Sequence, residues 1–469
     1  MNIHKVWLGA AVVQLSLGSV FAQSQGSSDD INTLKKQIQE LDQKVRILER
    51  NREVEGEAVQ SKKADSPKLS AGADGFGFSS ADTNFVLKLH GAVQVDGRFY
   101  QGDHIPVNDT FLLRRVRPTF EGTLFQHYDY RIMLDFGAGN TAATGNNSLV
   151  QDAYLNIHYW PEFQIQLGKF KTPVGLERLQ SDVDYTFTER GYPTQLVPNR
   201  DVGVQIHGEL FDGILGYQAG IFNGVQDGGS GDQDISDDHK DVAGRIFLRP
   251  FKNVNVEPLR GLGFGVAGTY GNQAGPLRGF TTPGQQNFFG YRTGSGNAST
   301  NVTADGLHWR LVPQAYYYWG PLGIFGEYAL SSQQIRRDTA PAAGTTRLNV
   351  DNTAWEVTVS YILTGEENSW KGIRPRNPLS FASHTWGALE VVGRVEELKL
   401  DAGLFPLYAT SSSARRAFSY GAGLNWYLNK SIKLSADYEH TDFSGGSKAR
   451  GNVTAQDEHV ILTRAQVSF

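Results

Sequence analysis

The chain has 469 residues, 20% of them charged, and a formal net charge of −5, so its composition gives no reason to expect nucleic acid as a partner. It contains no cysteine, which excludes disulfides, zinc–thiolate sites and thiol nucleophiles. Its 53 glycines, together with 8 Trp, 19 Tyr and 26 Phe, indicate a protein rich in strands and turns.

The first 22 residues have the features of an export signal. His4 and Lys5 precede an apolar run from Val6 to Val20, and Val20-Phe21-Ala22 supplies small residues at the cleavage positions. The run is too short to span a membrane, and no later stretch has 18 uninterrupted apolar residues. We therefore predict a signal peptide at 1–22 and a mature protein that leaves the cytoplasm.

A short heptad pattern follows the signal. Its apolar residues are spaced alternately three and four apart: Ile31, Leu34, Ile38, Leu41, Val45 and Leu48. This predicts a coiled-coil helix at 29–52, of the pattern that favours two strands. Because it has fewer than three heptads, we expect it to assemble only when another part of the protein brings chains together. The alternative is an amphipathic helix that packs on its own domain. Residues 53–80 are rich in charge, Ser, Gly and Ala and are predicted to be a linker.

From Phe85 onward the apolar residues alternate with polar ones. In FVLKLHGAVQVDGRFY, Phe85, Leu87 and Leu89 begin one face, whereas Lys88 and His90 begin the other. Such alternation predicts half-buried strands. We predict sixteen of them, near 85–100, 111–124, 128–137, 150–159, 163–170, 202–211, 214–223, 241–250, 261–270, 307–318, 322–330, 353–363, 385–396, 415–428, 431–441 and 458–469.

The connections between these segments alternate in length. Long gaps such as 101–110, 138–149 and 171–201 alternate with short ones such as 125–127, 212–213 and 429–430, and only 364–384 departs clearly from the pattern. Long loops on one side, short turns on the other and an even number of strands are typical of an outer-membrane barrel. We therefore predict an all-β fold, in which residues 81–469 form a 16-stranded antiparallel transmembrane β-barrel.

Several motifs resemble the phosphate-selective porin O and P family: FLLRRVRPTFEG (111–122), GKFKTPVGLERLQS (168–181), NRDVGVQIHG (199–208) and AGIFNG (219–224). The resemblance implies a trimeric channel in the bacterial outer membrane, in contact with membrane lipid and lipopolysaccharide, with its N-terminal helix in the periplasm. Some family members are selective for phosphate or polyphosphate, and others for unrelated solutes. A homotrimer differs from the dimer-type heptad pattern, but so short a coiled coil follows whatever it is tethered to.

Basic residues on the polar face of the strands are candidates for an anion path. Arginine suits this role because its planar fork stays charged and binds two phosphate oxygens at once. Arg115 and Arg117 fall on the polar face of their strand, whereas Arg114 falls on the apolar face unless a bulge turns it inward or it lies at a trimer contact. The family's paired arginines at this motif imply that Arg114 and Arg115 both line the pore. The predicted path comprises Arg98, Arg114, Arg115, Arg117, Arg131, Arg178, Arg190, Arg245, Arg310 and Arg464.

The gap 171–201 is long and dense in charge, and we expect it to fold into the lumen. The resemblance places Arg178, Arg190, Arg131 and the acid Asp152 at the constriction. Alternatively, Arg178 and Arg190 pair with the loop's own acids, Asp182, Asp184 and Glu189, and only hold the loop together.

The function predicted is passive diffusion of small anions, with phosphate or polyphosphate as candidates. Because acids on the polar face roughly match the bases, a weakly selective or organic-solute porin on the same barrel is the alternative. Asp182 and Asp184 also allow a secreted β-rich hydrolase. We predict no catalytic residues, no metal-ligand set and no cofactor, since the histidines are scattered singly and the one Gly-rich stretch lies on a strand.

Overall fold

The computed structural model describes residues 28–64, 66–72, 75–102, 107–138, 149–233, 237–294, 300–338, 345–446 and 457–469. The chain divides into two compact units, Met1–Ser66 and Pro67–Phe469. The predicted signal peptide at 1–22 lies outside the described residues.

The first unit contains one long helix, α1 (Ser28–Ala64). It contains the predicted helix at 29–52 but continues into the segment predicted to be a linker. Residues 53–64 (EVEGEAVQSKKA) are mostly Glu, Ala, Gln and Lys, which are good helix formers, so the helix continues through this charge-rich segment. No helix in the described part of the chain is long and apolar enough to cross a membrane.

Two strands follow in the described part of the predicted linker. Strands β1 (Lys68–Gly72) and β2 (Gly75–Ser79) form a hairpin, and β2 pairs with residues 86–89 of β3. The same edge of β3 then pairs with β20 from Ala92 to Gln101. The prediction of a linker at 53–80 was therefore wrong over most of its length. The strand β2 was missed because its alternating segment, Phe76-Gly77-Phe78, is too short to reveal a strand from sequence alone.

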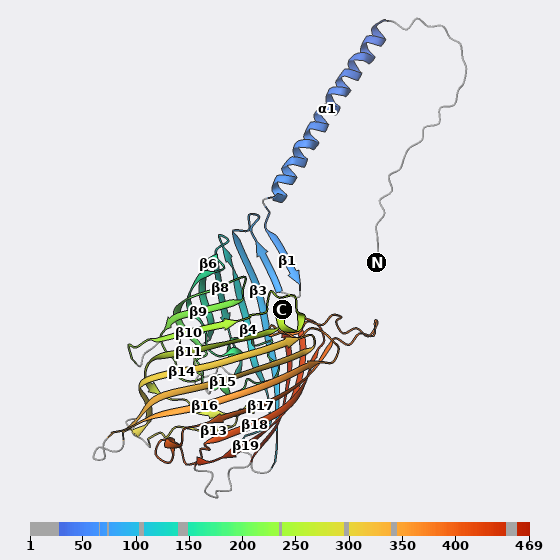
Figure 1. The fold of residues 1–469 in the computed structure, drawn as a ribbon. Coiled ribbons are helices and arrows are strands. Elements are labelled where there is room, and N and C mark those ends of the chain that lie inside the picture. The colour runs from blue at the N-terminus through green and yellow to red at the C-terminus, as the bar shows by residue number, and fades with distance from the viewer. Residues whose placement is uncertain are drawn as a thin grey trace. The chain divides into compact units, whose positions relative to one another are not determined.

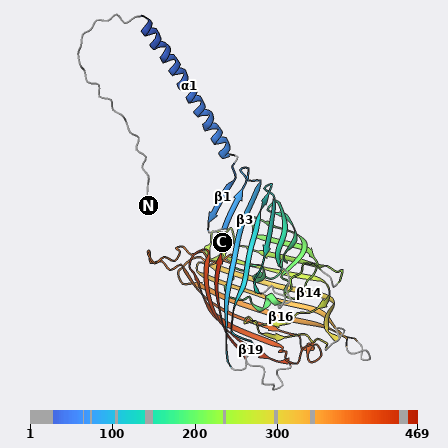
Figure 2. The same cartoon turned by 180° about the vertical axis from the view of Figure 1, so that it is seen from behind.

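The second unit is a closed antiparallel barrel of sixteen strands, as predicted (Figure 1). Each strand pairs with the next in the chain, and β20 pairs with β3 to close the sheet, so that the first strands (blue) lie beside the last (red) in Figure 2. The wall consists of β3 (Phe85–Gln101), β4 (Thr110–Leu124), β5 (Tyr128–Leu134), β6 (Val150–Trp160), β7 (Phe163–Lys171), β8 (Arg200–Leu210), β9 (Leu215–Phe222), β10 (Asp241–Leu248), β11 (Leu262–Pro276), β14 (Val302–Trp319), β15 (Leu322–Asp338), β16 (Thr345–Ile362), β17 (Ala388–Lys399), β18 (Arg416–Tyr427), β19 (Ile432–Ser444) and β20 (Glu458–Ser468).

Short elements occupy the connections. These are α2 (Leu176–Leu179) and η3 (Tyr192–Gln195) between β7 and β8, α3 (Glu257–Arg260) before β11, the two-stranded β12–β13 (Phe280–Thr281 and Asn287–Phe289) after β11, and η5 (Ala402–Leu404) before β18.

Strands β14, β15 and β16 are longer than predicted. Their pairing continues through polar segments, where Ser331 to Arg337 face Asn352 to Thr346. The sequence prediction ended these strands early because the outward face becomes polar there, which removes the period-two signal without removing the backbone hydrogen bonds.

The wall is apolar outside and polar inside. On β16, Val357 and Val359 are 45% and 43% exposed, whereas the intervening Thr358 and the preceding Glu356 are buried. A soluble protein would bury the valines and expose the glutamate, so this arrangement is the one typical of a transmembrane barrel.

Candidate functional site

A β-bulge determines the direction of Arg114. Gln94 on β3 pairs with Arg115 on β4, but the next residue, Val95, pairs with Leu113, so Arg114 is the extra residue of a bulge. Its side chain reaches the loop between β7 and β8, where Nε and Nη2 donate to the two carboxylate oxygens of Glu189 at 2.5 and 3.0 Å. Arg114 therefore points inward together with Arg115, which is one of the two possibilities that the sequence left open.

The loop between β7 and β8 (172–199) crosses the lumen. Strands β17 and β18 lie halfway around the closed sheet from β7 and β8, yet their side chains and those of their neighbours bind this loop. Five side chains of the wall donate hydrogen bonds to carbonyl oxygens of the loop. The pairs, donor first, are Gln94 and Asp182 (2.9 Å), Gln466 and Val183 (3.0 Å), Lys433 and Tyr185 (3.0 Å), Asn425 and Thr186 (2.7 Å), and Arg394 and Glu189 (2.9 Å). Loop N–H groups of Thr188 and Tyr192 donate in return to Asp437 and Glu396, each at 2.6 Å. The loop thus narrows the channel, as the sequence predicts.

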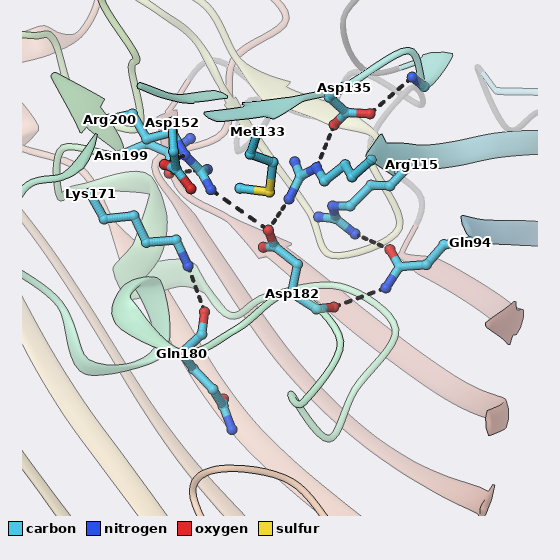
Figure 3. Close-up of polar contacts among 12 residues, drawn as sticks. Gln94, Arg115, Met133, Asp135, Asp152, Lys171, Gln180, Asp182, Asn199 and Arg200 are labelled. Carbon is cyan, nitrogen blue, oxygen red and sulfur yellow. Dashed lines mark hydrogen bonds and ion pairs between the residues drawn. The ribbon is translucent and has the colours of Figure 1, made fainter. Parts of the chain in front are cut away.

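Asp182 is the first of two acidic centres in the loop (Figure 3). Its carboxylate pairs with Arg117 and Arg190, and Arg200 lies 3.9 Å away. Arg117 also pairs with Asp135 at 2.7 Å, and Arg200 with Asp152 at 2.8 Å. Arg190 therefore pairs with an acid of its own loop, which was the alternative that the sequence left open.

Glu189 is the second acidic centre. Besides Arg114 it pairs with Arg98 at 3.3 Å, and Arg464 lies 3.8 Å away. Burial alone would raise the pKa of Glu189, but Arg114 and Arg98 more than offset this and hold the pKa below its ordinary value. Glu189 is therefore ionised at neutral pH and neutralises arginines of the wall.

A cavity of about 380 Å³ lies against these two centres. The charged residues in its lining are Arg98, Arg114, Arg115, Arg117, Arg178, Arg190, Arg200, Arg278, Asp135, Glu189 and Asp227. Eight arginines thus face three carboxylates, and the excess stays positive even when the adjacent Asp152 and Asp182 are included.

Two predicted path residues in this lining keep their charge without an acidic partner. Arg115 is 4% exposed, donates to Gln94 Oε1 at 2.7 Å and lies over the ring of Tyr185. Arg178 donates to the carbonyl oxygen of Thr194. Neither forms an ion pair with any carboxylate that the structure describes. Burial lowers the pKa of Arg178 to about 9, which still leaves it protonated at neutral pH.

The other predicted residues lie outside the cavity lining. Arg310 pairs with Asp227 at 2.8 Å and its side chain is 0% exposed, while Arg464 forms a two-pronged pair with Asp96, both distances being 2.7 Å. Arg131 lies between Glu121 and Asp152, and Arg245 binds two glutamines and stacks on Phe247. The structure therefore does not bring the ten arginines and Asp152 into one continuous surface.

Sequence reasoning missed Arg200 and Arg278. Arg200 begins β8 and was placed in the loop by the predicted strand boundary, although its position in the motif NRDVGV was a signal that could have identified it. Arg278 lies in the loop after β11, where no periodic pattern assigns a face. The sequence left open that loop arginines pair with Asp182 and Glu189, but it did not indicate that arginines of the wall would pair with them as well.

The chain matches the model of the family described as phosphate-selective porin O and P over residues 87–469. It belongs to that family. It is 23% identical to Porin O of Pseudomonas aeruginosa over 429 residues, covering 84% of this chain and 91% of that relative. The family and the barrel identify an outer-membrane channel and favour a channel over the secreted hydrolase.

Solved structures of similar fold include outer-membrane channels. A loop-deletion mutant of OmpT from Vibrio cholerae aligns with a TM-score of 0.50 and 12% identity, covering 82% of this chain and all (100%) of the other. The outer-membrane channel DcaP of Acinetobacter baumannii also aligns with a TM-score of 0.50 and 12% identity, covering 84% and 99%. At this identity the likeness concerns the fold alone.

Proposed function

We propose that this porin passes small anions by passive diffusion and that tetrahedral oxyanions such as phosphate bind weakly in the arginine-lined cavity. The observation that carries the proposal is the excess of arginine over carboxylate in the lining, where Arg115 and Arg178 form no ion pair with any described acid. Unneutralised guanidinium groups attract an anion, and several such groups along the path make each binding site weak enough for the anion to leave it.

The remaining path residues have different parts in this proposal. Arg98, Arg114, Arg117 and Arg190 line the cavity but share their charge with Glu189, Asp135 or Asp182. Arg131, Arg245, Arg310 and Arg464 act through the long-range potential and not by contact. Asp152 orients Arg200 and Arg131 at the narrow part.

A weakly selective porin is the second candidate, and the wall facing the loop favours it. Strands β15 to β19 carry the buried acids Glu327, Glu356, Glu390, Glu396, Asp437 and Glu439. An acidic wall across from an arginine-rich one produces a transverse field, which orders water and dipolar solutes and gives little preference for either sign of ion.

The zero-current potential of the purified channel in a planar bilayer under a KCl gradient separates the two candidates. Strong anion selectivity with block by added phosphate supports the oxyanion path. A potential near zero, or one directed toward cations, contradicts that path and supports the weakly selective channel.

We also propose that the porin is a homotrimer with α1 in the periplasm. The heptad residues of α1, from Ile31 to Leu48, are 46–66% exposed in the single chain, so they are free to pair with other copies. The apolar outer face of the barrel would contact lipid and lipopolysaccharide, and residues 1–22 would be removed on export.

A further inference from the structure

Three buried glutamates meet where the lumenal loop touches the wall. Glu177 comes from α2 of the loop, Glu327 from β15 and Glu356 from β16. Each offers a carboxylate oxygen, and these three oxygens all lie within 4.8 Å of one another. The residues are only 6%, 4% and 1% exposed, so water screens them poorly.

The pairing of the strands makes this proximity unavoidable. Glu327 and Glu356 are directly opposite residues of β15 and β16, and both point inward. Like charges in such a position repel each other and destabilise a sheet. The loop adds a third acid at the same point instead of a compensating base.

Hydrogen bonds satisfy only part of the cluster. The N–H of Leu176 donates to Glu327 Oε2 at 2.5 Å, and the N–H of Gly191 donates to Glu177 Oε2 at 2.9 Å. Glu327 Oε1 and both carboxylate oxygens of Glu356 are buried without any hydrogen-bond partner in the described chain. Several oxygens of the cluster therefore lack a hydrogen-bond donor among the described residues.

The nearby arginines of the described chain form no ion pair with these three carboxylates. Arg394 pairs with Glu396 at 3.1 Å and with Glu439 at 2.6 Å, and its third nitrogen donates to the carbonyl oxygen of Glu189. Arg178 donates to the carbonyl oxygen of Thr194. Isolated buried carboxylates cost several kcal/mol each, so the cluster must be neutralised by protons or by a cation. The convergence of three carboxylates with unpartnered oxygens favours a cation.

We propose that Glu177, Glu327 and Glu356 bind one divalent cation of the Ca²⁺ type. Hard carboxylate oxygens are the ligands that Ca²⁺ prefers, at about 2.3–2.6 Å, so two oxygens on one ion are separated by at most about 5 Å. The separations within this cluster satisfy that limit. The ion joins α2 to β15 and β16 and so fixes the constriction loop to the wall, a role independent of which solute the channel prefers.

The test measures Ca²⁺ binding directly on the full-length protein in detergent, after removal of divalent ions with EDTA, by isothermal titration and equilibrium dialysis with radioactive Ca²⁺. The wild type is expected to bind one Ca²⁺ per chain, and Glu356→Gln to lower the affinity by about tenfold or more, since charge count tunes such sites. Glu390→Gln is the matched control: Glu390 is equally buried in the neighbouring wall but accepts hydrogen bonds from Asn425 and Tyr427. It should leave the affinity unchanged.

Heat-modifiable mobility on a gel shows whether each variant has folded. If Glu356→Gln does not fold, Glu327→Gln takes its place in the same measurement. The proposal is overturned if the wild type binds no Ca²⁺, if the substituted cluster binds it as tightly as the wild type, or if the Glu390 control loses affinity to the same extent.

Discussion

Replacing Arg115 with Gln removes a positive charge that forms no ion pair with a carboxylate in the described part of the chain. The wild-type guanidinium donates to Gln94 and lines the cavity. A phosphate held about 4 Å from a guanidinium gains about 1 kcal/mol where the effective dielectric constant is that of water and about 4 kcal/mol where it is ~20. In a water-filled lumen we expect the lower part of this range, about 1–2 kcal/mol, which is a ~5- to 30-fold weaker block by phosphate.

The assay is the inhibition of chloride conductance by phosphate in a planar bilayer, together with the zero-current potential. Arg347→Gln is the matched control, because it removes the same charge from a side chain 68% exposed on β16 and paired with Asp305. The reasoning is refuted if Arg115→Gln and Arg347→Gln shift the inhibition constant and the potential equally.

Three further outcomes are expected. Glu189→Gln releases two wall arginines from their ion pairs and should raise anion selectivity, seen as a larger zero-current potential; an unchanged potential would show that these arginines lie outside the permeation field. Burial raises the pKa of Asp184, in the loop, to about 6, so its negative charge disappears as the pH falls from 7 to 5 and anion selectivity should rise over that range. Asp184→Asn should abolish this rise in selectivity. If the rise persists in the variant, another group causes it. The double substitution Leu34→Asp and Leu41→Asp should prevent chemical cross-linking of chains through α1. Lys36→Asp, which lies outside the heptad residues, should not prevent it. Equal cross-linking in the wild type and both variants would exclude the coiled coil.

The barrel could be predicted because lipid imposes a simple rule on every strand. An outward side chain must be apolar and its neighbours face water, so FVLKLHGAVQVDGRFY shows period two without ambiguity. At the ends of β14, β15 and β16 the outward residues are polar, so the rule gives no signal there, and this is why these ends were missed. The hairpin of β1 and β2 was missed for the related reason that five residues are too few to establish a period.

The direction of Arg114 shows a different limit. The alternation of β4 by itself places Arg114 toward lipid, and only the pairing of Gln94 and Val95 with Arg115 and Leu113 shows that one residue is extra. A bulge is a property of two strands in register, and a single strand's sequence contains only half of that information. The sequence could state that a bulge would turn Arg114 inward but not whether one exists.

Charge on the polar face was predictable, but which charges remain unneutralised was not. Arg115 and Arg117 stand two residues apart on one face of β4, yet Arg117 pairs with Asp135 and Asp182, whereas Arg115 contacts the amide of Gln94 and the ring of Tyr185. An anion responds to the difference between charges at each height in the channel and not to the number of arginines in the chain. That difference is determined by where the loop places Asp182 and Glu189 against the wall, so changing one loop acid should alter selectivity as much as changing an arginine.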